Sequence, residues 1–198
     1  MKWGLRLCLC VAILALGVGL GCSGVPRVTD SAAALRAVRA EMDRRPTVAP
    51  GSEVERQAID RLKAFLSRID ADSVRDRTLS VYAPDAYLND TLVSRRGATN
   101  IQAYFLETVE AAESITAQVE DVSRSADGFY YVRWVMDARM KKVAAGETLR
   151  TLGITLIRFD DQGRVLIHQD YWDSAAGLWE HVPGIGRGIR WIKGRLEH

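Results

Sequence analysis

Cysteine and histidine are scarce in this chain, with three of each among 198 residues. The cysteines are Cys8, Cys10 and Cys22, so the rest of the chain can form no disulfide, thiolate metal site or cysteine nucleophile. Two of the histidines, His181 and His198, lie in the last part of the sequence, which leaves too few imidazoles for a catalytic zinc site. We predict neither a metal nor a cofactor.

An excess of charge of one sign is also missing. The chain has 27 basic and 25 acidic side chains, a formal net charge of +2, which is too small to predict a nucleic-acid partner. Long apolar runs are missing too, because the longest uncharged apolar stretch, residues 7–20, has 14 residues. That length is short for a membrane span but typical of the core of a signal peptide.

The first 22 residues resemble a bacterial lipoprotein signal. Lys2 and Arg6 precede the apolar run, and the run ends at Gly19-Leu20-Gly21-Cys22-Ser23. The family prefers leucine three places before the cysteine, where this chain has Gly19. The resemblance implies lipidation at Cys22, attachment to a membrane, and a cell-envelope location facing the periplasm or the exterior. A plain secretory signal or an uncleaved anchor is the alternative reading of the same pattern.

Helical signals dominate the next part of the chain. Residues 23–51 are predicted to be a tether with a short alanine-rich helix, ended by the prolines and glycine at 46–51. A domain boundary is placed at Ser52, where Ser52 and Glu55 form a capping box that opens a helix reaching about Ile69. Two further helices are expected over 73–82 and 100–111, with a short strand over 86–91 between them.

After residue 113 the apolar period changes from helical to strand-like. Strands are expected from residue 115 and over 129–141, 148–159 and 164–172, joined by short turns, so they should form an antiparallel meander. Helices followed by such a sheet predict an α+β fold. In the second of these strands Trp134 and Met136 share the apolar face.

The seven residues Ile167–Asp173 have the densest chemistry in the chain. Because side chains alternate along a strand, His168, Asp170 and Trp172 share one face. A histidine, a carboxylate and an indole on one face form either a pocket wall or a polar patch in water.

A fold-level resemblance comes from three motifs: Tyr82-Ala83-Pro84-Asp85 leading to Tyr87-Leu88-Asn89-Asp90, the turn Arg158–Val165, and His168–Asp173. Residues 52–180 resemble the nuclear transport factor 2-like superfamily in its SnoaL-like branch. The resemblance implies a cone-shaped α+β barrel whose helices and curved antiparallel sheet enclose an apolar pocket. Trp134, Met136 and Trp172 are then expected to bind a small hydrophobic molecule.

Two enzyme branches of that superfamily are compared residue by residue. Limonene epoxide hydrolase-like enzymes use a Tyr-x-Asn pair and an Asp-Arg-Asp relay; Tyr87, Asn89 and Asp170 match, whereas the arginine and the other aspartate do not. With His168 they form the candidate catalytic set. A ketosteroid isomerase-like site is rejected because only Asp90 lies near a required position. Strand parity also prevents Tyr87 and Asn89 from sharing a pocket with Asp90.

Two functions stay open. A binding module would lose support if the cavity were smaller than ~300 Å³. An enzyme using Asp170 would require carboxylate, amide and phenol to converge on one water-sized point. In the non-catalytic interpretation His168 is a structural histidine with satisfied hydrogen bonds, and Asp170 is a buried carboxylate that caps the first turn of the C-terminal tail.

Two surfaces are also interpreted. The outer sheet face, with Arg133, Asp137 and Arg139, is compatible with a homodimer, as is common for this fold. Residues 181–198 are expected to form a basic amphipathic helix, which either packs on the domain or lies on an anionic membrane.

Overall fold

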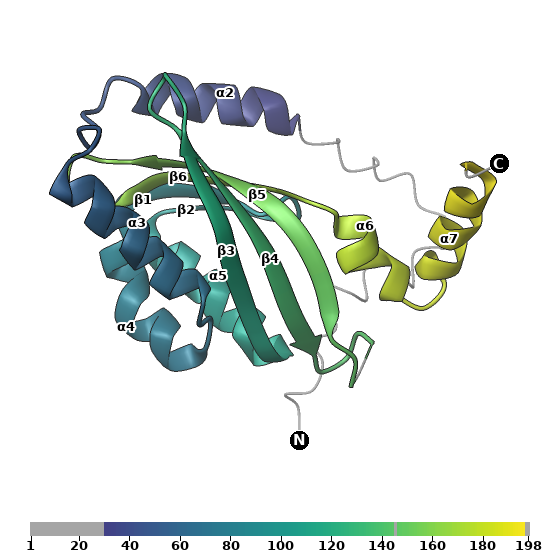
Figure 1. The fold of residues 1–198 in the computed structure, drawn as a ribbon. Helices are drawn as coiled ribbons and strands as arrows, with labels where there is room; N and C mark the ends of the chain where they lie inside the picture. The colour runs from purple at the N-terminus through teal and green to yellow at the C-terminus, as the bar shows by residue number, and fades with distance from the viewer. Residues whose placement is uncertain (1–29, 145, 197–198) are drawn as a thin grey trace, which may run out of the picture. The chain divides into compact units, whose positions relative to one another are not determined.

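A computed structural model describes residues 30–144 and 146–196 (Figure 1). The expected signal peptide and the lipidation site at Cys22 lie outside the described residues. The chain divides into two units at Ala34, and the unit from Leu35 onward contains the domain. Within residues 30–144 and 146–196, no helix is both long and apolar enough to cross a membrane.

The helices lie close to where the sequence predicts them, and two short helical segments lie between the sheet and the last helix. They are α2 (Ser31–Met42), α3 (Glu53–Leu66), α4 (Ala71–Val81), α5 (Ala98–Ala111), α6 (Ser174–Gly177), the 3-10 turn η1 (Trp179–His181) and α7 (Ile185–Leu196). The strands are β1 (Tyr82–Asn89), β2 (Ser94–Arg96), β3 (Ala112–Arg124), β4 (Tyr130–Met140), β5 (Leu149–Phe159) and β6 (Val165–Trp172).

Side-chain caps explain where two of the helices begin. The Ser52 hydroxyl accepts a hydrogen bond from the Glu55 amide at 3.1 Å, and the Glu55 carboxylate accepts one from the Gly51 amide at 2.5 Å. This is the predicted capping box, with its return bond one residue earlier than in the standard motif. Asp70 caps α4 through the Ser73 amide at 2.8 Å, so α4 begins two residues before the expected start.

The sheet has the order β2-β1-β6-β5-β4-β3. Strands β3 to β6 form the predicted antiparallel meander, whereas β1 pairs in parallel with β6, a contact between distant parts of the chain that was not predicted. The sheet is curved and does not close on itself (Figure 1). The α+β prediction is therefore confirmed.

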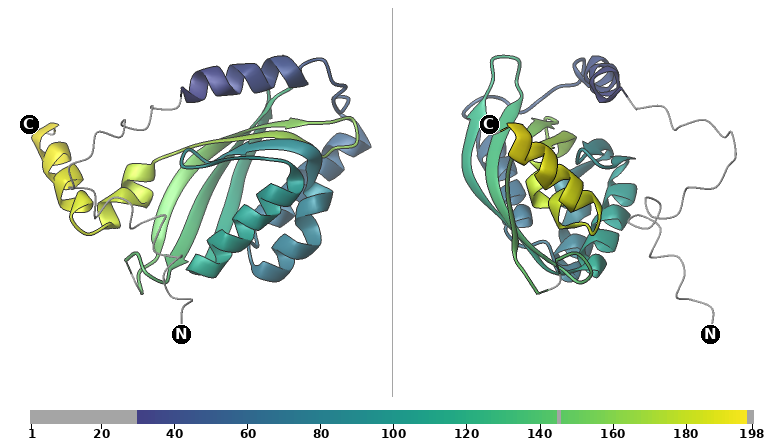
Figure 2. Two further views of the ribbon diagram at one scale, coloured as in Figure 1. Left: turned by 180° about the vertical axis from the view of Figure 1, so that it is seen from behind. Right: turned by 90° about the vertical axis from the view of Figure 1, so that its right-hand side faces the viewer.

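Helices α3, α4 and α5 lie together against one face of the sheet (Figure 2). Phe65, Tyr82 and Phe105 interlock between them, with ring centroids 5.4–6.1 Å apart. Full burial of a ring such as that of Phe65 stabilises the fold by about 1.5–3 kcal/mol, and the partly buried Phe105 contributes less. This aromatic cluster fixes α5 at the distance from the sheet that leaves space for a cavity beside it.

The segment before α3, which was predicted to be a tether, packs against the domain. Val38, Met42 and Val48 are all buried in the same core as the sheet. Residues 35–51 thus pack with the domain, although the sequence analysis placed them before its boundary. Leu35, Val38 and Met42 lie at helical spacing on α2 and form one apolar stripe that the sequence already contains, whereas Val48 lies beyond Pro46.

Candidate functional site

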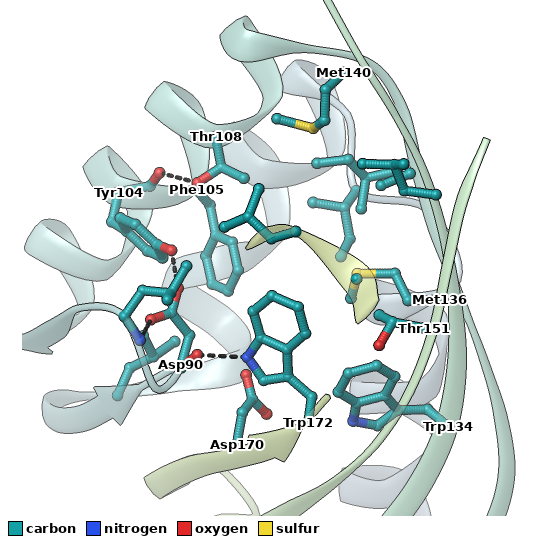
Figure 3. A pocket seen from close by; sticks show the side chains of 18 residues that line it. Asp90, Tyr104, Phe105, Thr108, Trp134, Met136, Met140, Thr151, Asp170 and Trp172 are labelled. Carbon is teal, nitrogen blue, oxygen red and sulfur yellow. Dashed lines mark hydrogen bonds between the residues drawn. The ribbon is translucent and has the colours of Figure 1, made fainter. Parts of the chain in front are cut away.

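A cavity of about 210 Å³ lies between α5, the sheet and the connection after β6 (Figure 3). Most of its wall is aliphatic, aromatic or thioether, with two carboxyl groups at one end. The wall consists of Ile69, Leu88, Asp90, Leu92, Tyr104, Phe105, Thr108, Ile115, Trp134, Met136, Ala138, Met140, Leu149, Thr151, Asp170, Trp172, Gly177 and Leu178. Trp134, Met136, Asp170 and Trp172, which the sequence analysis selected, all belong to it.

A glycine makes room for the two tryptophans of the wall. Gly153 pairs with Trp134 on one side and with Trp172 on the other, so the three lie in a row across β4, β5 and β6. A Cβ atom at Gly153 would lie 2.5 Å from the Trp134 ring and 2.9 Å from Trp172 Cβ. The Trp134 indole therefore lies flat over the backbone of β5, where only glycine leaves the space.

A chain of hydrogen bonds holds Asp170. The Trp134 indole N–H donates to the Thr155 hydroxyl at 2.8 Å. Since an indole can only donate, the Thr155 O–H is directed onward to Asp170 Oδ1, at 2.5 Å. His168 Nε2 lies 2.9 Å from the same oxygen, and His168 Nδ1 lies 2.9 Å from the Tyr82 hydroxyl. The network fixes the Asp170 carboxyl at the cavity wall.

Tyr82 ends this chain deep in the core. It is fully buried, and this burial, together with the charge of Asp170, raises its pKa well above the ordinary value of a phenol. The phenol therefore stays protonated over the ordinary pH range. Its O–H can donate to His168 Nδ1, which leaves His168 Nε2–H to donate to Asp170.

Asp90 provides the second carboxyl group. Its Oδ1 accepts from the amides of Leu92 at 2.9 Å and Val93 at 2.7 Å, and its Oδ2 accepts from the Tyr104 hydroxyl. Burial raises the pKa of Asp90, and the charge of Asp170 adds to this rise, against the two amide hydrogen bonds that lower it. The Trp172 indole N–H donates to the backbone carbonyl of Asp90 at 2.7 Å, which ties the ends of β1 and β6 together.

Residues 62–168 match the model of the SnoaL-like domain family, which is more than half of the chain. The chain belongs to the SnoaL-like family. Comparison with curated protein sequences gives no significant match.

Solved structures with the nuclear transport factor 2-like fold resemble this SnoaL-like chain. An NTF2-like protein of unknown function from Exiguobacterium sp. 255-15 is 15% identical, with a TM-score of 0.51 over 59% of this chain and 98% of its own. An LEH-like epoxide hydrolase from M. tuberculosis is 13% identical, with a TM-score of 0.50 over 74% and 99%. A phenazine biosynthesis-related protein from Pseudomonas aeruginosa is 12% identical, with a TM-score of 0.53 over 66% and 87%. These identities establish a shared fold only.

The SnoaL-like domain does not bring Tyr87 and Asn89 to the cavity. Register places Leu88 beside His168 and Asn89 beside Gln169, so Tyr87 and Asn89 lie on the opposite face of the sheet. Asn89 Nδ2 donates to Ser94 Oγ at 2.7 Å, and Tyr87 Oη lies 3.4 Å from the same atom. The amide and the phenol therefore do not converge with Asp170, because strand parity brings Asp90 to the cavity in their place.

His168 is not part of the wall of the SnoaL-like cavity. It is 3% exposed and stands behind Asp170, which gives it a positioning role rather than contact with a ligand. Asp170 does not cap the tail, since Asp173 accepts from the Ala176 amide at 3.0 Å at the start of α6. Within the described parts of the chain, no group of three or more acidic, histidine or cysteine side chains is placed to hold a metal ion.

Sequence reasoning missed Thr155 and Tyr104 as supports of the two carboxyl groups. Thr155 lies directly across from Asp170 in the β5–β6 hairpin. Counting outward from the Phe159–Val165 pair would have placed Thr155 opposite Gln169, because the hairpin contains a register shift between Arg158 and Phe159. Tyr104 reaches Asp90 from α5, and no local pattern reveals that contact.

Proposed function

We propose that this SnoaL-like domain binds a small, mainly apolar organic molecule in its cavity while lipidation at Cys22 holds it to a membrane of the cell envelope. The observation that carries the proposal is the wall itself, in which apolar side chains surround two fixed carboxyl groups. Ligand pockets have this composition, with a few polar groups that set orientation. Trp134, Met136 and Trp172 would contact the apolar part of the ligand.

The size of the cavity limits the ligand. At about 210 Å³ it is below the ~300 Å³ given above as the lower limit for a binding module, so the volume counts against that function for any ligand of ordinary size and leaves room only for a small one. The volume corresponds to about seven water molecules at ~30 Å³ each. A compact molecule with a single ring is therefore the class of ligand that we propose.

Membrane attachment draws support from the end of the chain as well as from Cys22. In α7 the side chains of Trp191, Ile192 and Leu196 are 60%, 53% and 80% exposed. The helix carries Arg187 and Arg195 and contains no acidic residue. Aromatic and aliphatic side chains beside basic ones favour the surface of an anionic membrane.

Cell fractionation tests the membrane attachment in this proposal, and titration with cyclohexanol tests the binding. Full-length protein should appear in the membrane fraction, and Cys22→Ser should move it to the soluble fraction. The detergent-purified wild type should then bind cyclohexanol saturably, seen as a change in tryptophan emission, because Trp134 and Trp172 line the cavity. Ala138→Phe should abolish this binding by filling the cavity. Unchanged saturable binding in Ala138→Phe would place the ligand elsewhere and refute the proposal.

Acid–base catalysis is a second candidate function, supported by the pair of carboxyl groups. Asp90, with its raised pKa, can give a proton to an oxirane oxygen while Asp170 takes one from the attacking water as the C–O bond breaks. The product would be a diol. General acid–base assistance is worth on the order of 10²–10⁴ in rate.

Cyclohexene oxide is the probe for this second candidate. Wild type should form the diol well above the uncatalysed rate, and Asp170→Asn should remove that excess without changing the thermal midpoint by more than a few degrees. No turnover in the wild type, or equal turnover in Asp170→Asn, would argue for binding without catalysis. Failure of Asp170→Asn to fold would make Asp170 structural.

A further inference from the structure

We propose that the ligand of this cavity is a small organic cation, a protonated amine carried on a compact apolar group. This inference rests on the proposed binding function and names the chemical class of its ligand. Three features of the wall support it: its charge, its aromatic faces and the way in which its carboxyl groups are already satisfied.

The wall contains acidic groups with no basic counterpart. Asp90 and Asp170 both line the cavity, and among the described residues its wall includes no lysine, arginine or histidine. Arg95 lies 5.3 Å from the centre of the Tyr104 ring but is not part of the wall. An anionic ligand would be repelled by Asp170, whereas a cation would be attracted by it and would also favour the charged form of Asp90 against the burial that raises the pKa of that carboxyl.

The hydrogen bonds of the two aspartates leave this charge in place. Asp90 accepts from two backbone amides and a phenol, and these donors are neutral. Asp170 accepts at Oδ1 from the Thr155 hydroxyl and from His168 Nε2–H. In the tautomer in which the Tyr82 O–H donates to Nδ1, the imidazole adds no positive charge. The protein's donors bind Oδ1 of Asp170. Oδ2 is therefore the oxygen that is open to a hydrogen bond from a ligand N–H.

Aromatic rings form much of the remaining wall. Trp134, Trp172, Tyr104 and Phe105 surround the end of the cavity that holds the two aspartates (Figure 3). The faces of such rings attract a cation through their quadrupole, and indole does so most strongly. A neutral apolar ligand would make the same apolar contacts, but it would gain neither the attraction to the carboxylates nor the cation–π interaction.

A matched set of cyclohexane derivatives tests the charge of the ligand. Cyclohexylamine is protonated at pH 7, like a lysine side chain, and has the size of cyclohexanol. We expect its Kd to be on the order of tenfold lower than that of cyclohexanol, by cation–π and charge-assisted hydrogen bonding. Cyclohexanecarboxylate should not bind. Tryptophan emission and calorimetry measure all three.

Two aspartate variants and one control locate the effect. Asp170→Asn and Asp90→Asn should each bring the affinity for cyclohexylamine down toward that for cyclohexanol, while the alcohol changes less than twofold. Asp161→Asn removes a charge at an exposed turn position outside the cavity and should change neither. If Asp170→Asn does not fold, Asp90→Asn decides.

The outcomes separate this inference from the binding function. If cyclohexanol binds and cyclohexylamine binds no better, the cation is refuted and the binding function stands. If neither compound binds, the binding function fails and this inference with it. If the amine binds tightly but Asp161→Asn weakens it as much as Asp170→Asn does, the attraction is a general surface effect and the cavity does not select cations.

Discussion

Gly153→Ala should destabilise the domain by about 1–3 kcal/mol and abolish binding in the cavity. The added methyl group would lie 2.5 Å from the Trp134 ring, much closer than van der Waals contact allows. The ring must move away, which breaks its hydrogen bond to Thr155 and changes the wall. The measurements are the free energy of unfolding in urea and the affinity for cyclohexanol.

A double variant identifies the cause. Trp134→Phe removes the atoms that the new methyl group would meet, so the effects of Gly153→Ala and Trp134→Phe should be less than additive. Gly188→Ala is the control, since a Cβ atom there meets nothing within 4 Å, and it should leave stability unchanged or slightly raised. Additive effects at 153 and 134 would show that the row of Trp134, Gly153 and Trp172 is not under steric constraint.

Thr155→Val should cost about 1–3 kcal/mol although it keeps the size and shape of the side chain. Thr155 is 1% exposed and links the Trp134 indole to Asp170. Valine removes the hydroxyl from the middle, which leaves a buried indole N–H without an acceptor and Asp170 without one of its donors. The wall keeps its volume, so cyclohexanol should still bind although the free energy of unfolding, measured in urea, falls.

Thr116→Val is the matched control for that substitution. Thr116 is also a strand threonine, but it is exposed on β3. Its replacement should change the free energy of unfolding by less than about 0.5 kcal/mol. If Thr155→Val were equally harmless, water or a rearranged side chain would be satisfying the indole, and the chain of hydrogen bonds would not determine the position of Asp170.

Local patterns predicted most of the sheet and part of the site. Alternation placed Trp134 and Met136 on the apolar face of β4 and put Asp170 and Trp172 on one face of β6. The resemblance to the SnoaL-like branch then predicted that these faces line the pocket, and the cavity contains all four residues. The helical stripes and caps similarly gave α3 to α5 to within a few residues. These features depend on period and turn chemistry, which a sequence carries within a short window.

What the sequence did not reveal depends on register between distant segments. Tyr87 and Asn89 were chosen by analogy, although parity allowed either them or Asp90 to face the cavity, and nothing local decided between the two sets. The register of the parallel pairing between β1 and β6 places Asp90 on the cavity side and Tyr87 and Asn89 on the opposite face. The space over Gly153 likewise exists only because three strands align Trp134, Gly153 and Trp172 in one row.

Asn89 and Gln169 touch across the contact between β1 and β6, yet they are 80 positions apart in the chain. At a synthesis rate of ~5–20 residues per second, β1 leaves the ribosome roughly 4–16 s before its partner. Asp90 remains without Trp172 for about that time, and Trp134 remains without Trp172 for roughly 2–8 s. The cavity is therefore completed only when the last strand arrives, and a nascent chain stalled before Trp172 would expose its apolar wall to chaperones and to other chains.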